Sequence, residues 1–313
     1  MEVGVNGREC HGKDGTQMIT NNLNLPQPFV DAVTSDYKPT EGRYSVTRVL
    51  GSQCEAVLLR RHGGEIDGDV ADYLWQIFGS AVHKILEESK ETEDQIKENY
   101  ITVPIDEHYT LSGIFDLYDD STGTVTDWKT ASLWKIKFAN FEDWEKQTLY
   151  YCWMLRQIGF KNARRGEIVA MIKDHNKREA RKDPEYPQHP VVVKSWDFSE
   201  EDLARGEKEI REWFRQVAIA ESLPDELLTP CTPEQRWAKP DKWAVKKGKA
   251  KRALRVFGTQ QEAAQYVDSH SVQNNKPQDL WIEYREGEDT KCDGYCDVRR
   301  WCPYYQVKVK ADF

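Results

Sequence analysis

Two short patterns in this sequence place carboxylates and a lysine where they could act on one substrate. Asp116 ends the stretch Gly113-Ile-Phe-Asp116, and Asp127 begins Asp127-Trp-Lys129-Thr130, with a turn-rich segment at 119–123 between them. If the two stretches are antiparallel strands joined by that turn, the two carboxylates can converge on one point. Two aspartates and a main-chain carbonyl offer the oxygen ligands that Mg²⁺ or Mn²⁺ prefers, and they leave coordination positions for water and a phosphate.

Lys129 follows Asp127 by two residues, so on a strand both side chains point to the same face. An ammonium group beside a metal ion can orient an attacking water or neutralise charge that develops on a phosphate. The alternative is an exposed ion pair between Asp127 and Lys129, because an Asp-x-Lys triplet is common by chance.

Two predicted helices could add polar groups to this site. In a helix expected over 69–88, His83 shares a face with Gly79 and Glu87, away from the apolar stripe. That stripe consists of Leu74, Ile77, Phe78, Ala81, Val82, Ile85 and Leu86. An imidazole can complete the coordination of Mn²⁺, although an exposed His–Glu pair would give the same pattern. In a second helix, expected over about 141–158, Gln147 and Tyr151 stand one turn apart; the alternative there is a core helix whose glutamine faces water.

Three cysteines lie within eleven residues of one another: Cys292, Cys296 and Cys302. Thiols spaced so closely can wrap around one inorganic centre. A cubane iron-sulfur cluster needs four thiolates, so one further ligand would have to come from elsewhere. The alternatives are a zinc site or incidental thiols. Cys152, in the apolar helix, and Cys10, near the N-terminus, are expected to be non-ligands.

The motifs, taken in order, resemble those of RecB-like nucleases in the PD-(D/E)XK superfamily. They run from Gly79 to His83, from Gly113 to Asp116, from Asp127 to Thr130 and from Gln147 to Tyr151. The resemblance implies that the metal ion is held by His83, Asp116 and Asp127, assisted by the carbonyl of Trp128. It implies that Lys129 serves the water and the transition state, and that Gln147 and Tyr151 place the DNA backbone or support the lysine. Phe115 stands where the superfamily's name has proline, a departure that is common among RecB-like members.

The cysteine cluster resembles that of the AddB and CRISPR-associated iron-sulfur nucleases. This resemblance implies a structural 4Fe-4S cluster whose fourth ligand is an upstream cysteine that ties the C-terminus to the nuclease core. Cys54 matches the position used in those families. Cys231, in Thr229-Pro-Cys-Thr-Pro233, is closer in sequence to the triplet, and we favour it over Cys54. The whole chain resembles phage-encoded exonucleases of this group.

The expected fold class is α/β (α+β), with a restriction-endonuclease-like core whose mixed central sheet is flanked by helices. Strands are expected at 100–105, 109–118, 124–128, 165–172 and 191–198, and helices within 45–61 and at 69–88, 141–158 and 200–220. A small β-β-α-β insertion is expected from segments 243–247, 253–257, 260–267 and 280–286. The expected organisation is a loosely ordered N-terminal arm at 1–40, the nuclease core at 41–229, the accessory module at 230–290 and the iron-sulfur segment at 291–313.

Composition limits the surroundings in which such a protein works. The 313 residues contain no apolar run near the roughly 20 residues that span a bilayer, so no membrane partner is expected. A polar N-terminus without a secretory signal predicts a cytoplasmic location, that of the host if the chain is phage-encoded. In a reducing compartment, seven cysteines do not suggest a disulfide framework.

The net charge of -9 means that DNA would have to be bound through local basic strips. Two such strips, at 173–182 and 246–252, supply the candidate DNA contacts Lys173, Lys177, Arg178, Lys246, Lys247 and Lys249. A solvated loop or hairpin turn is the alternative for either strip alone.

Together these expectations predict a Mg²⁺- or Mn²⁺-dependent deoxyribonuclease, an exonuclease that gives 5′-phosphate products in DNA recombination, repair or replication. A single-strand-annealing or other recombination protein is a candidate partner. One rival is a structure-specific endonuclease, which would cut closed circles. The other is a non-catalytic DNA-binding recombination partner, against which the intact Asp-Asp-Lys set argues.

Overall fold

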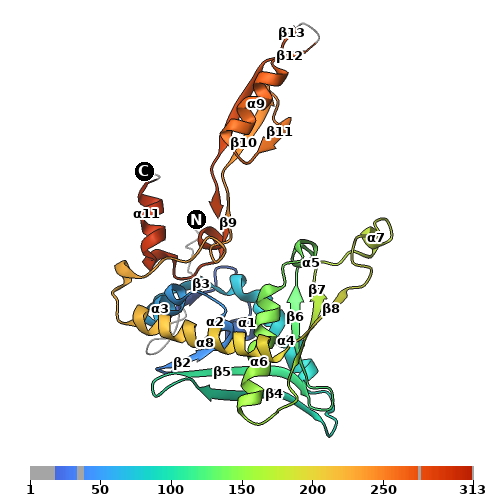
Figure 1. The fold of residues 1–313 in the computed structure, drawn as a ribbon, viewed down its shortest axis with the longest axis vertical. Coiled ribbons are helices and arrows are strands. Elements are labelled where there is room, and N and C mark those ends of the chain that lie inside the picture. Colours follow the sequence, from blue (N-terminus) through green and yellow to red (C-terminus); the bar gives the residue numbers. More distant parts are fainter. Residues whose placement is uncertain (1–17, 34–38, 274–275, 312–313) are drawn as a thin grey trace, which may run out of the picture. The chain divides into compact units, whose positions relative to one another are not determined.

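The computed structural model describes residues 18–33, 39–273 and 276–311, and the chain divides between Pro224 and Asp225 into two compact units. The first unit contains a mixed sheet and its helices, and the second contains small sheets and the cysteine-rich segment (Figure 1). None of the helices in these ranges is both long enough and apolar enough to cross a membrane.

A six-stranded mixed sheet forms the centre of the first unit, as the sequence predicted. Its strands are β2 (Arg43–Ser45), β4 (Gln95–Pro104), β5 (Thr110–Asp119), β6 (Thr124–Ala131), β7 (Arg165–Ile172) and β8 (Val191–Asp197). β6 and β7 are parallel, as are β2 and β5, whereas β4–β5, β5–β6 and β7–β8 are antiparallel. Buried and half-buried residues alternate along β7, the pattern of a strand with one face on the core.

The middle of β5 has an open edge. β4 pairs along nearly the whole of β5. On the opposite edge, β2 pairs only with residues 110–112 and β6 only with residues 117–119. Residues 113–116 therefore face no strand on that edge, and their polar groups are accessible to side chains of the helices.

Helices flank this sheet. They are α1 (Gln27–Val33), α2 (Val46–Val49), α3 (Gln53–His62), α4 (Leu74–Glu87), α5 (Leu133–Phe138), α6 (Glu142–Gln157), α7 (Lys177–Ala180) and α8 (Glu200–Glu221), with short 3-10 turns at Gly63–Glu65 and Val70–Tyr73. α6 packs between β7 and α8, which crosses it in Figure 1, and its residues 147–155 are all buried. Gly166 allows this close packing, because a Cβ there would lie 2.1 Å from Thr148 Oγ1.

Part of the segment expected to be a loosely ordered arm is folded. β1 (Met18–Thr20) pairs in parallel with β3 (Asp67–Asp69), and Val30 and Val33 of α1 form a small core with Ile19 and Val70. The sequence reading missed this because the apolar residues are few and widely spaced. Residues 1–17 of the expected arm, which include Cys10, and residues 34–38 lie outside the described residues.

The apolar stripe of α4 is only partly covered, which corrects the expectation of an ordinary amphipathic packing face. Ile77 packs against the small core of α1, but Leu74, Phe78 and Ile85 are exposed. The reason is the position of the helix: its main neighbours are α1, the 3-10 turn before it and β6, and they leave part of the stripe uncovered.

The second unit contains the predicted β-β-α-β segment. β10 (Lys242–Lys247), β11 (Arg255–Phe257) and β14 (Leu280–Arg285) form an antiparallel sheet with β10 at its centre, and α9 (Gln260–His270) packs on it. A small hairpin is formed by β12 (Val272–Gln273) and β13 (Lys276–Pro277). The rest comprises β9 (Ala238–Lys239), β15 (Glu288–Asp289), α10 (Thr290–Gly294), α11 (Pro303–Ala311) and 3-10 turns at Asp225–Leu227 and Arg299–Trp301.

Candidate active site

The two predicted aspartates lie opposite each other on β5 and β6. The β5–β6 ladder ends at the pair Leu117–Thr126, and Asp116 and Asp127 are the next residues in the same register. Beyond the last backbone pair, the Asp116 side chain makes the contact between the two strands: its Oδ2 accepts a 2.6 Å hydrogen bond from the Trp128 main-chain N–H. Asp116 is 4% exposed and Asp127 is 2% exposed, so neither is an ordinary surface acid.

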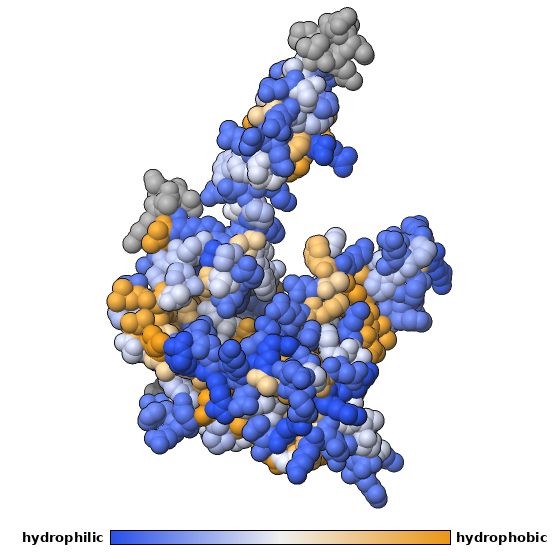
Figure 2. Space-filling view, viewed as in Figure 1, coloured by the Kyte–Doolittle hydropathy of each residue, from blue (hydrophilic) through white to orange (hydrophobic). Residues whose placement is uncertain are grey.

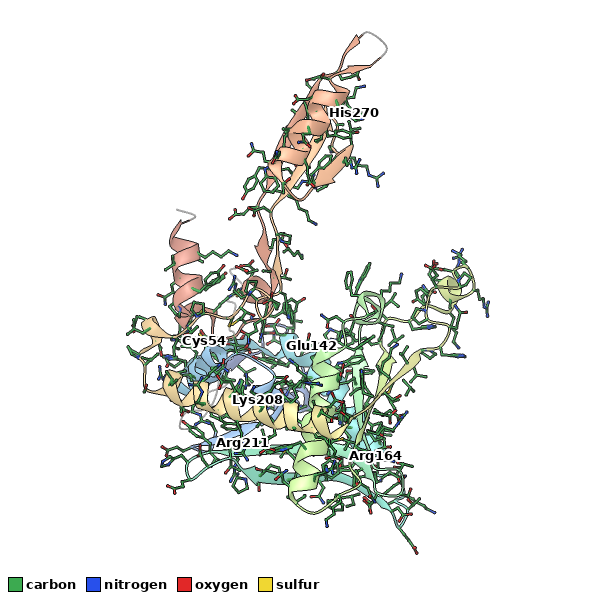
Figure 3. All side chains as sticks on the ribbon, viewed as in Figure 1. Cys54, Glu142, Arg164, Lys208, Arg211 and His270 are labelled. Atoms are coloured by element: carbon green, nitrogen blue, oxygen red, sulfur yellow. The ribbon has the colours of Figure 1, made fainter. Side chains whose placement is uncertain are left out.

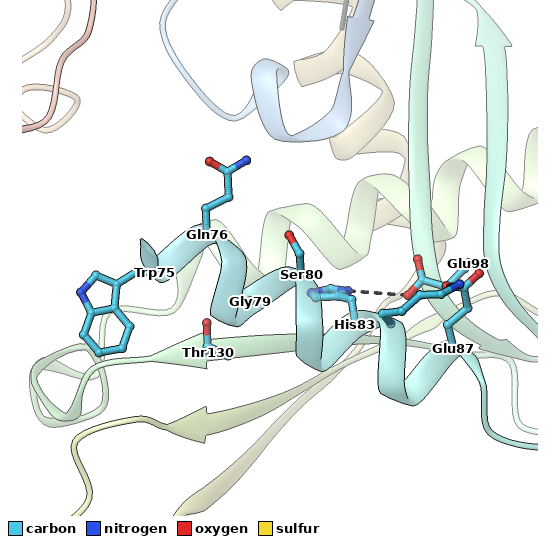
Figure 4. Close-up of a pocket in the computed structure, with 9 residues that line it drawn as sticks. Trp75, Gln76, Gly79, Ser80, His83, Glu87, Glu98 and Thr130 are labelled. Carbon is cyan, nitrogen blue, oxygen red and sulfur yellow. Dashed lines mark hydrogen bonds and ion pairs between the residues drawn. The ribbon is translucent and has the colours of Figure 1, made fainter. Parts of the chain in front are cut away.

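His83 reaches Asp116 from α4. Its Nδ1 lies 3.3 Å from Asp116 Oδ1 and 3.6 Å from Glu98 Oε1. Ligand atoms of His83, Glu98 and Asp116 all lie within 4.8 Å of one another. Figure 4 shows His83 pointing from α4 toward Glu98, while Glu87, its expected helical neighbour, pairs with Lys84 instead.

Glu98 is the functional candidate that the sequence analysis missed. It stands on β4 in register with Asp116, but its backbone is left-handed, with φ of 43°, and the pairing on either side skips this position. Such a conformation costs a residue other than glycine about 1–3 kcal/mol. The expected strand began only at residue 100, whereas β4 begins at Gln95, so the sequence analysis left Glu98 outside the sheet.

Glu98 Oε1 is buried without a hydrogen-bond partner among the described residues. Leaving a buried acceptor unsatisfied costs about 1–3 kcal/mol, more for a charged group. Together with the neighbouring imidazole and carboxylate, this oxygen fits a divalent cation, which would satisfy it. His83, Glu98 and Asp116 therefore form a donor set suited to Mn²⁺ or Mg²⁺.

Lys129 and Gln147 hold the second aspartate from two sides. Lys129 Nζ lies 2.7 Å from Asp127 Oδ2, and Gln147 Nε2 donates a 2.8 Å hydrogen bond to Asp127 Oδ1. The prediction that Asp127 and Lys129 share a strand face is confirmed, and Asp127 is buried, which argues against an exposed surface pair. Gln147 is 5% exposed, so it does not face water as the alternative required.

Tyr151 fixes the backbone of β5 rather than opening toward a substrate. Its hydroxyl donates a 2.7 Å hydrogen bond to the Ile114 carbonyl, in the interval of β5 that has no neighbouring strand on that edge. Gly113 makes room for the ring, because a Cβ there would lie 2.6 Å from Tyr151 Cε1. Tyr151 and Gln147, one helical turn apart, thus position the two strands that carry the acids.

The acids and the histidine shift one another's pKa values. Burial raises the pKa of Asp127, and the nearby Asp116 carboxylate adds to this while Lys129 opposes it. Burial and Asp116 likewise raise the pKa of Glu98. The hydrogen bond to Asp116 raises the pKa of His83. Several acids in a low-dielectric site disfavour their own ionisation, and a bound divalent cation would relieve that repulsion.

An open pocket of about 520 Å³ lies beside this donor set. Its lining includes His83 and Glu98 at one part and Trp75, Gly79 and Thr130 at another (Figure 4). The pocket gives a substrate access to the metal-binding candidates along the exposed side of α4.

The lysines and the arginine predicted to contact DNA have different surroundings. Lys173, Lys177 and Arg178 are exposed, the last two on α7. Lys249 is exposed in the turn after β10. Lys246, by contrast, is half-buried and pairs with Glu283, and Lys247 donates a hydrogen bond to Gln278, so both ammonium groups already have partners in the second unit.

The cysteine segment and the Cys231 loop are joined within the second unit. Burial raises the pKa of Cys292 to about 11, and the nearby Asp289 carboxylate acts in the same direction. Arg236 links the two segments, because it donates to the Cys231 carbonyl and, at 3.1 Å, to Asp289 Oδ1. Cys54 is buried in α3 of the first unit (Figure 3).

Comparison with known proteins places this site in a family. The profile of the PD-(D/E)XK nuclease superfamily matches residues 67–303. No curated protein matches the chain.

Solved structures show only slight likenesses to this chain. The crystal structure of SSO0001 has 13% identity over 63% of this chain and 85% of that one, with a TM-score of 0.45. The alkaline exonuclease LHK-Exo from Laribacter hongkongensis has 11% identity over 63% and 95%, with a TM-score of 0.35. A phage related exonuclease from Haemophilus somnus 129PT has 12% identity over 41% and 63%, with a TM-score of 0.26. These likenesses are too slight to carry the assignment, which rests on the profile match over more than half of the sequence: the chain belongs to the PD-(D/E)XK nuclease superfamily.

Proposed function

We propose that this protein is a metal-dependent deoxyribonuclease that removes nucleotides from DNA ends. The observation that supports this most directly is the set of His83, Glu98 and buried Asp116 beside an open pocket, next to the Asp127–Lys129 pair. Glu98 Oε1 has no hydrogen-bond partner among the described residues, and its ion-pair contact with His83 Nδ1 is long, at 3.6 Å, so a cation would complete its surroundings. Family membership supplies the reaction class, hydrolysis of a phosphodiester bond.

The proposal gives each residue a role. His83, Glu98 and Asp116 would hold Mg²⁺ or Mn²⁺, with Asp127 and the Trp128 carbonyl as the further ligands implied by the motif. The ion, when bound, would supply Lewis acidity to the phosphate and to the attacking water. Lys129 would neutralise charge that develops on the phosphate, and Gln147 would keep Asp127 in place. Water attacks phosphorus and the 3′ oxygen leaves, which gives 5′-phosphate products.

Digestion of end-labelled linear DNA beside a covalently closed circle tests this proposal. Wild-type protein with Mn²⁺ is expected to shorten the linear DNA stepwise and to leave the circle intact, whereas EDTA or Asp116→Asn stops digestion. Glu87→Gln is the matched control, because Glu87 lines the same pocket but pairs with Lys84. Cutting of the circle would indicate a structure-specific endonuclease. Binding of DNA without cleavage under any metal would indicate a non-catalytic partner and refute the proposal.

We also propose a 4Fe-4S cluster held by Cys231, Cys292, Cys296 and Cys302. Support comes from the position of all four cysteines in one unit, and from the Arg236 link between the Cys231 loop and the cysteine segment. Four thiolates around one centre are the ligand set that such a cluster requires. The cluster would be structural, and action beside a recombination protein stays a prediction from the resemblance.

Anaerobic purification and metal analysis test the cluster. The protein is expected to be brown, with broad absorbance near about 400 nm that is characteristic of thiolate-bound iron. Cys231→Ser should lose this absorbance and Cys54→Ser should retain it. The reverse result would assign the fourth ligand to Cys54, and a colourless, zinc-loaded protein would contradict the cluster.

A further inference from the structure

Trp75 is an exposed ring at the edge of the pocket that contains the metal-binding candidates. It lies on α4, 63% exposed, and lines the pocket with His83 and Glu98. Phe78, also exposed, meets it edge to face with ring centroids 6.2 Å apart. Lys173 Nζ lies over the Trp75 ring, 4.2 Å from its centroid. One ring and one cation are therefore paired at the entrance to the site.

A second pair of exposed rings lies on α5. Trp134 is 61% exposed and Phe138 is 75% exposed, and the two stack with centroids 5.8 Å apart and planes inclined by 25°. Lys137 Nζ lies 5.8 Å from the Trp134 centroid and 5.4 Å from that of Tyr186. Figure 2 shows hydrophobic residues gathered over α5 and the neighbouring strands of the first unit.

The two groups are joined through the end of β6. The Lys173 main-chain N–H donates to the Ala131 carbonyl at 3.0 Å, and the Leu133 N–H donates to Asp174 Oδ1 at 2.7 Å. Thr130, one residue earlier on β6, lines the pocket with Trp75. We call the set Trp75, Phe78, Lys173, Trp134, Lys137 and Phe138 the ring–lysine strip.

The chemistry of this strip fits one occupant. Among the described residues no carboxylate forms an ion pair with Lys137 or Lys173, and each ammonium group lies over an aromatic ring instead. Their charges suit phosphates, while the exposed rings suit the faces of bases. In a duplex those faces are stacked on one another, so only unpaired bases can reach the rings; stacking of a base on a protein ring contributes about 1–3 kcal/mol. An apolar protein partner would leave the two ammonium groups desolvated without a counter-charge.

We propose that the ring–lysine strip binds single-stranded DNA and leads it into the pocket beside His83 and Glu98. The strand entering the site is then unpaired over the nucleotides that contact the strip. The part of this inference that leads the strand toward the metal site rests on the proposed nuclease function. The binding itself can be measured without cleavage.

Equilibrium binding in EDTA tests the strip separately from catalysis. The probes are a fluorescein-labelled oligothymidine, an abasic strand of the same length, and a duplex. Trp75→Ala and the pair Trp134→Ala/Phe138→Ala are expected to weaken binding of oligothymidine by about 5- to 100-fold, the equivalent of one stacked base, with little change for the abasic strand. Lys173→Ala should weaken the binding of both single strands, and the salt dependence of binding should fall by about one released counterion.

Phe29→Ala is the matched control, because Phe29 is an exposed ring of the same unit outside the strip. Equal binding of oligothymidine by wild type and all ring variants would overturn the inference, as would an equal loss for the duplex. If the ring variants lose binding but wild type cleaves nothing with Mn²⁺, the strip stands and the nuclease proposal fails. If wild type cleaves and the ring variants bind normally, the nuclease proposal stands and the strip fails.

Discussion

The proposed metal site and the proposed cluster gather their side chains in opposite ways. The metal site takes His83 from α4, Glu98 from β4, Asp116 from β5 and Asp127 from β6. The cluster would take Cys292, Cys296 and Cys302 from one short stretch, and only Cys231 from a more distant loop. The metal site therefore depends on the whole sheet being assembled, whereas the cysteine segment depends mainly on local turns.

This difference predicts how each region would respond to loss of its ligand. In the metal site, Gln147 holds Asp127 and Tyr151 holds the backbone of β5, and both residues belong to the buried helix α6. Metal removal should leave that scaffold folded. The cysteine segment has short helices and few buried apolar residues, so a metal centre there would contribute directly to its folding.

Loss of Lys129 should have the largest effect on catalysis. Lys129→Met is expected to lower kcat by about 10²- to 10³-fold, as removal of one group that stabilises transition-state charge does. The melting temperature should also fall, because buried Asp127 loses its ion-pair partner, so kcat is compared at a temperature where both proteins are folded. Single-turnover cleavage of end-labelled DNA measures this, with Lys84→Met as the control. An unchanged kcat would remove Lys129 from the mechanism.

Replacement of Glu98 should separate metal binding from folding. Glu98→Gln is expected to weaken Mn²⁺ binding by about 10- to 100-fold. Without metal the variant should be no less stable than wild type, because an amide is less costly to bury than a carboxylate. Calorimetric titration with Mn²⁺ and thermal unfolding in EDTA give the two quantities. Wild-type Mn²⁺ affinity in the variant would exclude Glu98 as a ligand.

Loss of a cluster cysteine should affect the second unit alone. Cys302→Ser is expected to speed proteolysis within residues 225–311 by at least about tenfold, because the open state becomes more populated. Mn²⁺ binding by the first unit should stay within about twofold of wild type, as expected for sites that share no partners. Limited proteolysis with mass spectrometry measures the first effect. Equal protection in the variant would show that the thiols hold no structural centre.

The smallest expected effect is that of removing one tyrosine hydroxyl from α6, and it should differ between Tyr150 and Tyr151. Tyr151→Phe and Tyr150→Phe each remove one hydrogen bond, to the Ile114 carbonyl and to Glu209 respectively, and each should lower the free energy of unfolding by about 1 kcal/mol. Only Tyr151→Phe should also slow cleavage, because it loosens the strand that carries Asp116. Similar activities of the two variants would make Tyr151 a purely structural residue.

The sequence predicted those parts of the site that follow from strand and helix periodicity. Two residues along a strand share a face, so Asp127 and Lys129 could be paired in advance, and the register across a short turn brought Asp116 opposite Asp127. Gln147 was identified because a polar residue interrupts an apolar helix.

Other features depended on tertiary structure. Glu98 joins the site through a left-handed backbone position, which no periodicity signals. The exposed stripe of α4 has the same pattern as a buried one, and only the arrangement of its neighbours distinguishes the two. The pairing of β1 with β3 joins residues about fifty positions apart, beyond the reach of local propensity.

Mn²⁺ titration followed by electron paramagnetic resonance tests the central claim, that His83, Glu98 and Asp116 form the metal centre of a nuclease. Free Mn²⁺ should lose its signal on binding to wild type and to Glu87→Gln, and cleavage of linear DNA should rise with the bound fraction. Asp116→Asn should bind weakly and cleave nothing. Undiminished Mn²⁺ binding by Asp116→Asn, or cleavage that continues in EDTA, would contradict the account.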